Sequence, residues 1–144
     1  MSVIALDFGE RRIGVATSDP LGLTAQPLAV IDRTSLEADI SRIGAIVSQR
    51  RADRIVLGLP LNMDGTVGPQ AKRVRRFAAR LKRALGIEII LWDERLTTVE
   101  AETVGQERAP ALREREKRRR RTDAVAAAVI LQDYLEAQRR SAGQ

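Results

Sequence analysis

Short apolar runs along the chain predict five β-strands. Two turn signals, Phe8-Gly9 and Asp19-Pro20-Leu21-Gly22, separate the first three runs from one another. The two later runs are largely apolar throughout, and Pro60 ends the first of them. Continuous apolar runs are typical of central strands that are covered on both faces. The expected strands comprise residues 3–7, 12–18, 27–31, 55–59 and 88–92.

Between and after these strands, apolar residues recur at the spacing of helices. Thr34 and Thr97 are each followed three residues later by Glu, which is the spacing of a capping box at a helix start. The predicted helices begin at Thr34, Gly68, Thr97 and Asp123, and the last three end near Gly86, Gly105 and Gln138. The residues expected on the buried side of the last helix are Val125, Val129, Gln132 and Leu135.

The order of these elements predicts an α/β fold. Strands joined by short turns pair in antiparallel fashion, so the first three should form an antiparallel unit. Strands that follow a helix should add in parallel, through right-handed crossovers. We therefore expect a five-stranded mixed sheet with helices on its faces. The 144 residues fit one compact domain, expected over residues 1–138, followed by a flexible tail over 139–144.

The composition excludes several kinds of chemistry. The chain contains no Cys and no His, which rules out zinc sites built on thiolate or imidazole, thiol nucleophiles and Ser–His arrangements. Hydrophobic residues make up 44% of the chain, enough for a core. The apolar run before Asp7 is too short for a signal peptide or a membrane span. We expect a soluble, cytoplasmic protein without a membrane partner.

The distribution of charge indicates a polyanionic partner, namely nucleic acid. The formal net charge is +6, and residues 113–121 contain seven basic and two acidic residues, a net of +5 that leaves about +1 for the rest. Such a run attracts phosphates, although a solvated, charged helix end is the simpler alternative. The residues of this run predicted to bind substrate are Arg118, Arg119, Arg120 and Arg121.

Three acidic residues are expected to meet at one edge of the sheet. Asp7 ends the first strand, Glu94 follows the last strand, and Asp123 opens the last helix. Buried acids repel one another unless cations hold them, and ligands bind beyond the carboxyl ends of parallel strands. Converging carboxylates suit Mg²⁺ or Mn²⁺ and two-metal phosphodiester hydrolysis. We therefore predict that these three acids are both catalytic residues and metal ligands.

Each acid also has a simpler explanation. Asp7 could initiate a turn, and Asp123 could be favoured by the dipole at a helix start. Glu94 could pair with the neighbouring Arg95. Strand alternation is expected to point Asp93 away from Glu94, toward the opposite side.

Four segments that cover nearly the whole chain carry motifs in a fixed order. They are Asp7-Phe8-Gly9 with residues 12–19, residues 58–65, residues 93–98, and Asp123-Ala124 with residues 126–132. In this order and spacing they resemble the YqgF/RuvX family. That family has a ribonuclease-H-like fold related to the Holliday-junction resolvase RuvC, and its bacterial members are described as nucleases that trim the 5′ end of precursor 16S ribosomal RNA. The resemblance places the acidic triad at Asp7, Glu94 and Asp123, and departs from the family at Thr122, where an apolar residue is usual.

Three further residues are candidates for substrate binding. The resemblance implies that Asn62, in the polar loop 62–68, approaches substrate, and a plain Asp-Gly turn is the alternative. Arg12 and Arg95 either hold substrate phosphate near the acids or pair with acids nearby.

A metal-dependent nuclease that processes RNA is the function expected first. A resolvase of DNA junctions is the alternative among enzymes, and it would need two sites in a homodimer, so monomer and homodimer both stay open. A non-catalytic nucleic-acid-binding module is a third interpretation. It is disfavoured because such a module gains nothing from acids near the phosphates.

Overall fold

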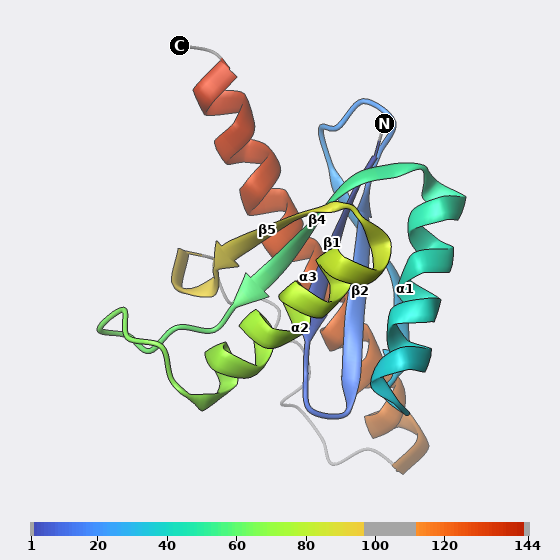
Figure 1. Cartoon of the computed structure of the whole chain (residues 1–144). Coiled ribbons are helices and arrows are strands. Elements are labelled where there is room, and N and C mark those ends of the chain that lie inside the picture. Colours follow the sequence, from blue (N-terminus) through green and yellow to red (C-terminus); the bar gives the residue numbers. More distant parts are fainter. Residues whose placement is uncertain (1, 97–111, 143–144) are drawn as a thin grey trace.

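A single five-stranded sheet with helices on both faces forms the centre of the protein (Figure 1). The computed structural model describes residues 2–96 and 112–142. The strand order is β3-β2-β1-β4-β5; β1 pairs with β2 and β2 with β3 in antiparallel fashion, whereas β1–β4 and β4–β5 are parallel, which confirms the predicted sheet. The elements are β1 (Ser2–Phe8), β2 (Arg12–Ser18), β3 (Ala25–Asp32), α1 (Leu36–Arg50), β4 (Ala52–Leu59), α2 (Pro69–Leu85), β5 (Glu88–Asp93), the short 3-10 helix η1 (Glu94–Leu96) and α3 (Leu112–Ala142).

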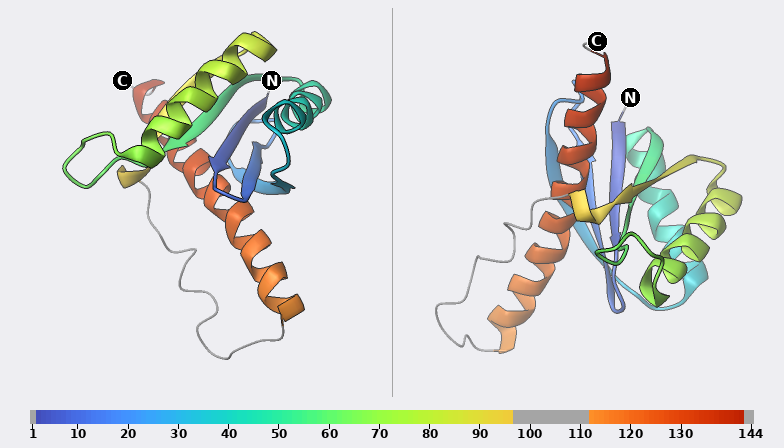
Figure 2. Two further views of the ribbon diagram at one scale, coloured as in Figure 1. Left: turned by 60° about the horizontal axis from the view of Figure 1, so that its bottom comes forward. Right: turned by 90° about the vertical axis from the view of Figure 1, so that its left-hand side faces the viewer.

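Strand alternation sends the side chains of β1 into two different cores. Ile4, Leu6 and Phe8 belong to the core beneath α1 and α2, whereas Ala5 belongs to the core beneath α3. Figure 2 shows these two helical layers on opposite faces of the sheet. Asp7 therefore faces the α3 side, at the end of the strand.

Local signals determine the ends of α2. Gly68 is the N-cap residue and Pro69 is the first helical residue. Gly86 ends the helix in the left-handed conformation with φ 62°, and its N–H donates to the carbonyl oxygen of Lys82. Both ends agree with the prediction, because Pro at a helix start and Gly at its end act through the backbone of a few neighbouring residues.

The capping box predicted at Thr34 is wrong by one residue. Ser35 is the N-cap of α1, and its hydroxyl oxygen accepts a hydrogen bond from the backbone N–H of Ala38 at 3.1 Å. Thr34 donates its own N–H to the carboxylate of Asp39, which is 1% exposed. The acid that completes the start of the helix is therefore Asp39, because it lies on the buried side of the helix.

Helix α3 is longer than predicted, and the face that it buries only partly matches the predicted one. It begins at Leu112, so Asp123 lies inside the helix rather than at its start. The intervening Arg, Lys and Glu residues are strong helix formers, which explains the extension. Val125 and Val129 are only partly buried, whereas Leu135 is buried as expected. The buried residues of α3 are Ala124, Ala127, Ala128, Ile130, Leu131, Tyr134 and Leu135.

The last turns of α3 continue to Ala142, past residue 138, where we expected the domain to end. Arg139 donates a hydrogen bond to the carbonyl oxygen of Leu23 at 2.8 Å, which joins this part of the helix to the connection between β2 and β3. The helix predicted to begin at Thr97 lies outside the described residues. Among the helices that the structure describes, none is long and apolar enough to cross a membrane.

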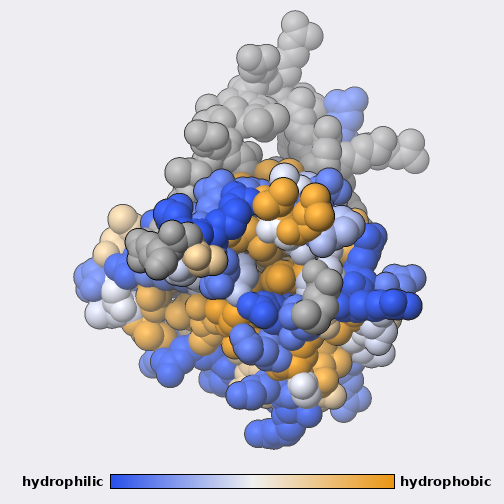
Figure 3. All heavy atoms as spheres, turned by 90° about the horizontal axis from the view of Figure 1, so that it is seen from above, coloured by the Kyte–Doolittle hydropathy of each residue, from blue (hydrophilic) through white to orange (hydrophobic). Residues whose placement is uncertain are grey.

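The end of the sheet at which β1 begins carries hydrophobic residues between hydrophilic ones (Figure 3). Leu21 and Leu23, in the connection between β2 and β3, are 78% and 45% exposed. The three predicted acids belong to the opposite end, where β1, β4 and β5 finish.

Candidate active site

Asp7 and Glu94 lie together, although β4 separates the strands that lead to them. Asp7 is in β1, and Glu94 begins η1 directly after β5. A side-chain hydrogen bond joins the two carboxyl groups. Gly58 of β4 lies between them, opposite Trp92 of β5. A Cβ atom at Gly58 would collide with Oε1 of Glu94 and with Cδ1 of Ile130, so the glycine is what allows Glu94 to reach across β4.

Burial raises the proton affinity of both members of this pair. Desolvation, and then the charge of Asp123, raises the pKa of Asp7 from 3.8 to about 6, while the hydrogen bond from Glu94 lowers it. Desolvation, and then the charge of Asp7 and the hydrogen bond, raises the pKa of Glu94 from 4.5 to about 7. A hydrogen bond between two carboxyl groups requires a proton on one of them, so the pair retains one proton as long as the bond is made. Two acids in contact share a proton in this way because both cannot be charged without repulsion.

Asp123 reaches the same edge from α3. Gly14 of β2 is the register partner of Asp7. A Cβ atom at Gly14 would collide with the backbone carbonyl of Asp123, so this glycine allows α3 to lie directly on β2. The Nε of Arg12 donates to Oδ2 of Asp123 at 2.7 Å. Arg12 therefore neutralises the third acid, which is one of the two roles that the sequence left open for it.

Side-chain contacts along α3 fix its position on the sheet. The Oε1 of Gln132 accepts a hydrogen bond from the backbone N–H of Ala25 in β3 at 2.9 Å. Trp92 of β5 donates its Nε1–H to Asp133 at 2.9 Å and lies edge-on to the ring of Tyr134, with centroids 5.5 Å apart. These contacts join α3 to both edge strands of the sheet, β3 and β5, and so fix the position of Asp123 on the sheet.

The three acids do not form a ready three-ligand metal site. Within residues 2–96 and 112–142, no group of three or more acidic side chains is placed to hold a metal ion. Asp7 and Glu94 present two hard oxygen donors side by side, whereas Arg12 holds Asp123. The donor set fits a divalent cation at the pair, with the third acid available only when it leaves Arg12.

Asn62 and Arg95 make contacts within the protein. Arg95 forms an ion pair with Asp93 at 2.7 Å, and its hydrogen bonds lower the pKa of Asp93. Arg95 also donates to the carbonyl oxygen of Met63 at 3.1 Å, which ties the loop after β4 to η1. Asn62 donates its side-chain amide to the hydroxyl of Thr66 at 2.9 Å. Asp93 is thus paired with Arg95, and its charge still contributes to the raised pKa of Glu94.

Two segments of the chain are rich in basic residues, and sequence reasoning identified one of them. Arg118, Arg119, Arg120 and Arg121 belong to α3, just before Asp123, and their side chains are outside what the structure describes. Helix α2 contains seven Lys and Arg residues and no acidic residue. Outside residues 113–121 the net charge is only about +1, because acidic residues elsewhere in the chain balance the positive charge of α2. The net charge therefore did not reveal that α2 is basic. A charge count for each predicted helix would have found it.

The chain is similar over its length to nucleases of known family. A family model described as "RuvX: Holliday junction resolvase" matches residues 1–137. A protein of Thermoanaerobacter pseudethanolicus is 48% identical over 139 residues, which are 96% of this chain and 99% of that protein. A protein of Myxococcus xanthus is also 48% identical over 139 residues, 96% of this chain and 90% of that protein. Both relatives carry the name "Putative pre-16S rRNA nuclease".

Resolvases are among the solved structures that resemble this chain. T. thermophilus RuvC in complex with a Holliday junction substrate superposes with a TM-score of 0.58 at 13% identity, over 96% of both chains. The fowlpox virus resolvase in complex with Holliday junction DNA superposes with a TM-score of 0.53 at 11% identity, over 96% of this chain and 99% of that chain. These likenesses confirm the ribonuclease-H-like fold.

Proposed function

The chain belongs to the RuvX family, and from this premise we propose that it is a nuclease whose active site is formed by Asp7, Glu94 and Asp123. The observation that carries the proposal is the hydrogen-bonded pair of Asp7 and Glu94. Burial and mutual repulsion both penalise the charges of two acids in contact, so the pair costs folding stability. Such a pair becomes useful when it binds a cation beside a phosphodiester, which is the arrangement of metal-dependent nucleases.

We propose precursor 16S ribosomal RNA, processed at its 5′ end, as the substrate. The names of the two relatives refer to this RNA, and the similarity spans nearly the whole of this chain and of each relative. The seven basic residues among residues 113–121 supply positive charge that a polyanionic substrate needs.

Mg²⁺ or Mn²⁺ is the cofactor in this proposal, held first by Asp7 and Glu94. A bound divalent cation would supply positive charge against the phosphate oxygens of the substrate. Loss of the shared proton leaves both side chains as carboxylates that can hold the cation. Arg12 pairs with Asp123 at 2.7 Å. If this ion pair opened, Asp123 could join Asp7 and Glu94 as a ligand of the cation, and the guanidinium of Arg12 could bind a substrate phosphate.

Cleavage of four-way DNA junctions is the second candidate, and the description of the matching family model favours it. Resolution of a junction requires two active sites related by a two-fold axis, and therefore a homodimer. A monomeric protein would favour the RNA substrate.

Cleavage by the purified protein tests both candidates. The substrates are a 16S RNA fragment with its 5′ extension, duplex RNA and a four-way DNA junction, each with Mg²⁺, Mn²⁺ or EDTA. We expect cleavage of the RNA extension with either metal and none with EDTA. Asp7→Asn, purified in the same way, is the control for contaminating nucleases. Cleavage in EDTA would contradict the metal requirement, cleavage of the junction alone would favour the second candidate, and a fully active Asp7→Asn protein would overturn the active site.

A further inference from the structure

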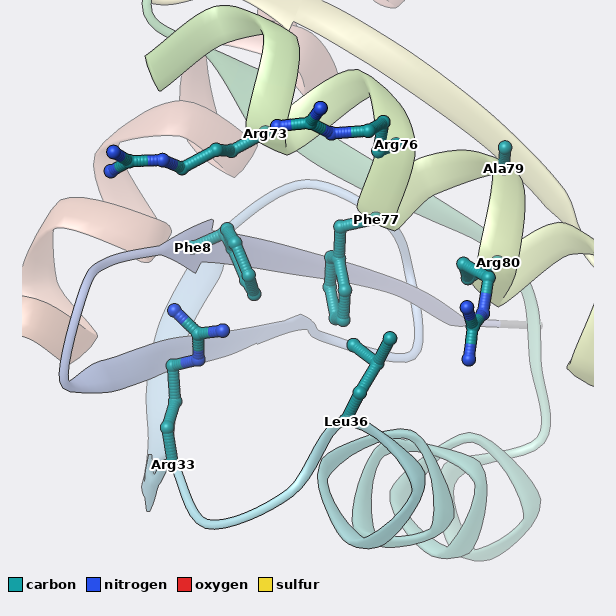
Figure 4. Close-up of a pocket in the computed structure, with 8 residues that line it drawn as sticks. All are labelled: Phe8, Arg33, Leu36, Arg73, Arg76, Phe77, Ala79 and Arg80. Atoms are coloured by element: carbon teal, nitrogen blue, oxygen red, sulfur yellow. The ribbon is translucent and has the colours of Figure 1, made fainter. Parts of the chain in front are cut away.

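A pocket of about 420 Å³ lies between α2 and the segment that leads into α1, on the face of the sheet opposite the acidic pair (Figure 4). Its floor is apolar and includes Phe8, Phe77 and Leu36. The two aromatic rings stack with their centroids 4.1 Å apart, and they are 7% and 3% exposed. Because each ring covers one face of the other and both rings are almost fully buried, they leave no open face on which a nucleic-acid base could stack.

Arginines surround this floor, and none of the lining residues within the described chain is acidic. The guanidinium of Arg33 lies 4.2 Å from the ring centroid of Phe8 and donates to the carbonyl oxygen of Gly9 at 2.9 Å. Arg73 forms an exposed ion pair with Glu10 at 3.6 Å. These two arginines are therefore held in place by the protein itself.

Arg76 and Arg80 complete the ring of arginines around the pocket from α2. Both side chains are exposed, and no hydrogen bond or ion pair joins either of them to another residue in the described part of the chain. They are four residues apart on one helix, a spacing at which like charges repel. An anion that binds beside an apolar floor would relieve this repulsion, and the low polarity of the floor would strengthen the attraction.

We propose that this pocket binds the phosphate backbone of a single-stranded RNA segment that continues from the acidic pair. Asp7 and Phe8 are consecutive at the end of β1 and face opposite sides of the sheet. An RNA segment that crosses this end of the sheet would therefore contact the acids on one face and the pocket on the other. Without an open ring face, the pocket recognises phosphate and not base identity. The inference rests on the proposed nuclease function, since it describes the path of that substrate.

A pair of double variants tests the pocket. Arg76→Gln with Arg80→Gln removes two charges from its lining, and Arg75→Gln with Lys82→Gln removes two exposed charges from the other flank of the same helix, which does not line it. Binding of a short labelled single-stranded RNA is measured by fluorescence anisotropy in EDTA at several salt concentrations. Melting temperatures confirm that both proteins are folded.

We expect the Arg76/Arg80 variant to bind RNA about tenfold more weakly, with a logarithmic salt slope smaller by about 1.4, since each phosphate that the protein neutralises on a single strand contributes roughly 0.7. The Arg75/Lys82 variant should keep a slope near that of the wild type. Equal losses in the two variants would show that α2 acts through its overall charge and would overturn the pocket. Unchanged binding by the Arg76/Arg80 variant would overturn it as well.

Free mononucleotides share the phosphate chemistry, and a second arm of the experiment separates them from RNA. AMP and inorganic phosphate are tested for thermal stabilisation of the wild type and of the Arg76/Arg80 variant. Stabilisation of the wild type alone, combined with unchanged RNA binding by the variant, would assign the pocket to a free nucleotide and refute the RNA path. Because binding is measured without cleavage, a failed nuclease assay with pocket-dependent RNA binding would affect only the proposed function.

Discussion

Replacing Gly58 with alanine tests whether the contact between Asp7 and Glu94 depends on the empty space above β4. The added Cβ atom would lie 2.7 Å from Cδ1 of Ile130 and would also collide with Oε1 of Glu94. The end of an isoleucine side chain can rotate away, but Glu94 can avoid the methyl group only by leaving Asp7. The substitution is therefore expected to separate the acidic pair without removing either acid.

The magnitude follows from two opposing effects on stability. Overpacking a filled site costs typically about 1–3 kcal/mol. Alanine in a strand recovers roughly 0.5–1 kcal/mol relative to glycine, because the unfolded chain loses less conformational freedom. We expect a net loss of about 1–2 kcal/mol in the free energy of unfolding. A displacement of a catalytic group by about 1 Å can reduce the rate roughly 100-fold, so the effect on cleavage should be much larger than the effect on folding.

Urea unfolding and the initial rate of RNA cleavage measure the two effects on the same preparation. Ile130→Val in the Gly58→Ala background should recover part of the stability, because it removes the methyl group that the new Cβ atom meets. It should not recover cleavage, because Glu94 stays displaced. A Gly58→Ala protein with wild-type stability and wild-type cleavage would refute the reasoning.

The charged residues of the protein lead to four further predictions. In EDTA, the free energy of unfolding should fall as the pH rises from about 4 to about 7, because the pKa values of Asp7 and Glu94 rise on folding to about 6 and about 7 from 3.8 and 4.5. Mn²⁺ should therefore raise the melting temperature more at pH 8 than at pH 5, and an equal effect at both pH values would contradict binding at this pair. The Asp123→Asn protein should fold and lose most of its RNA-cleavage activity. The Asp93→Asn protein should keep its activity, because Asp93 pairs with Arg95. Gel assays of RNA cleavage by both variants decide whether this difference exists. Replacement of Arg118–Arg121 by serine should reduce the logarithmic salt slope of RNA binding by roughly 0.7 for each phosphate that these arginines neutralise, and an unchanged slope would show that this run does not touch the RNA.

Much of the fold follows from signals that act over a few residues. The strand at residues 12–18 has the predicted bounds, and Gly68-Pro69 and Gly86 mark the ends of α2. The start of α3 could not be predicted in the same way. The basic run was interpreted as a segment before a helix that begins at Asp123, yet Arg and Lys favour helix as well as binding phosphate, and the two Glu residues of the run favour helix too.

The positions of the three candidate acids follow from the order of strands and helices, but their interactions do not. Asp7 contacts Glu94 only because Gly58 leaves room across β4, and Asp123 meets Arg12 only because Gly14 lets α3 lie on β2. In the sequence these glycines are single small residues within strands. Their effect depends on which element passes over them in the folded protein.

The pocket beneath α2 illustrates the same division. Composition alone determined that α2 is strongly basic, because a charge count needs no coordinates. Only the tertiary structure decided that Arg76 and Arg80 line the pocket while Arg75 and Lys82 do not. Helical spacing and turn residues act along the chain and can be deduced from the sequence. Contacts between residues far apart in the chain depend on how close the packed elements come, and this closeness arises from many side chains at once.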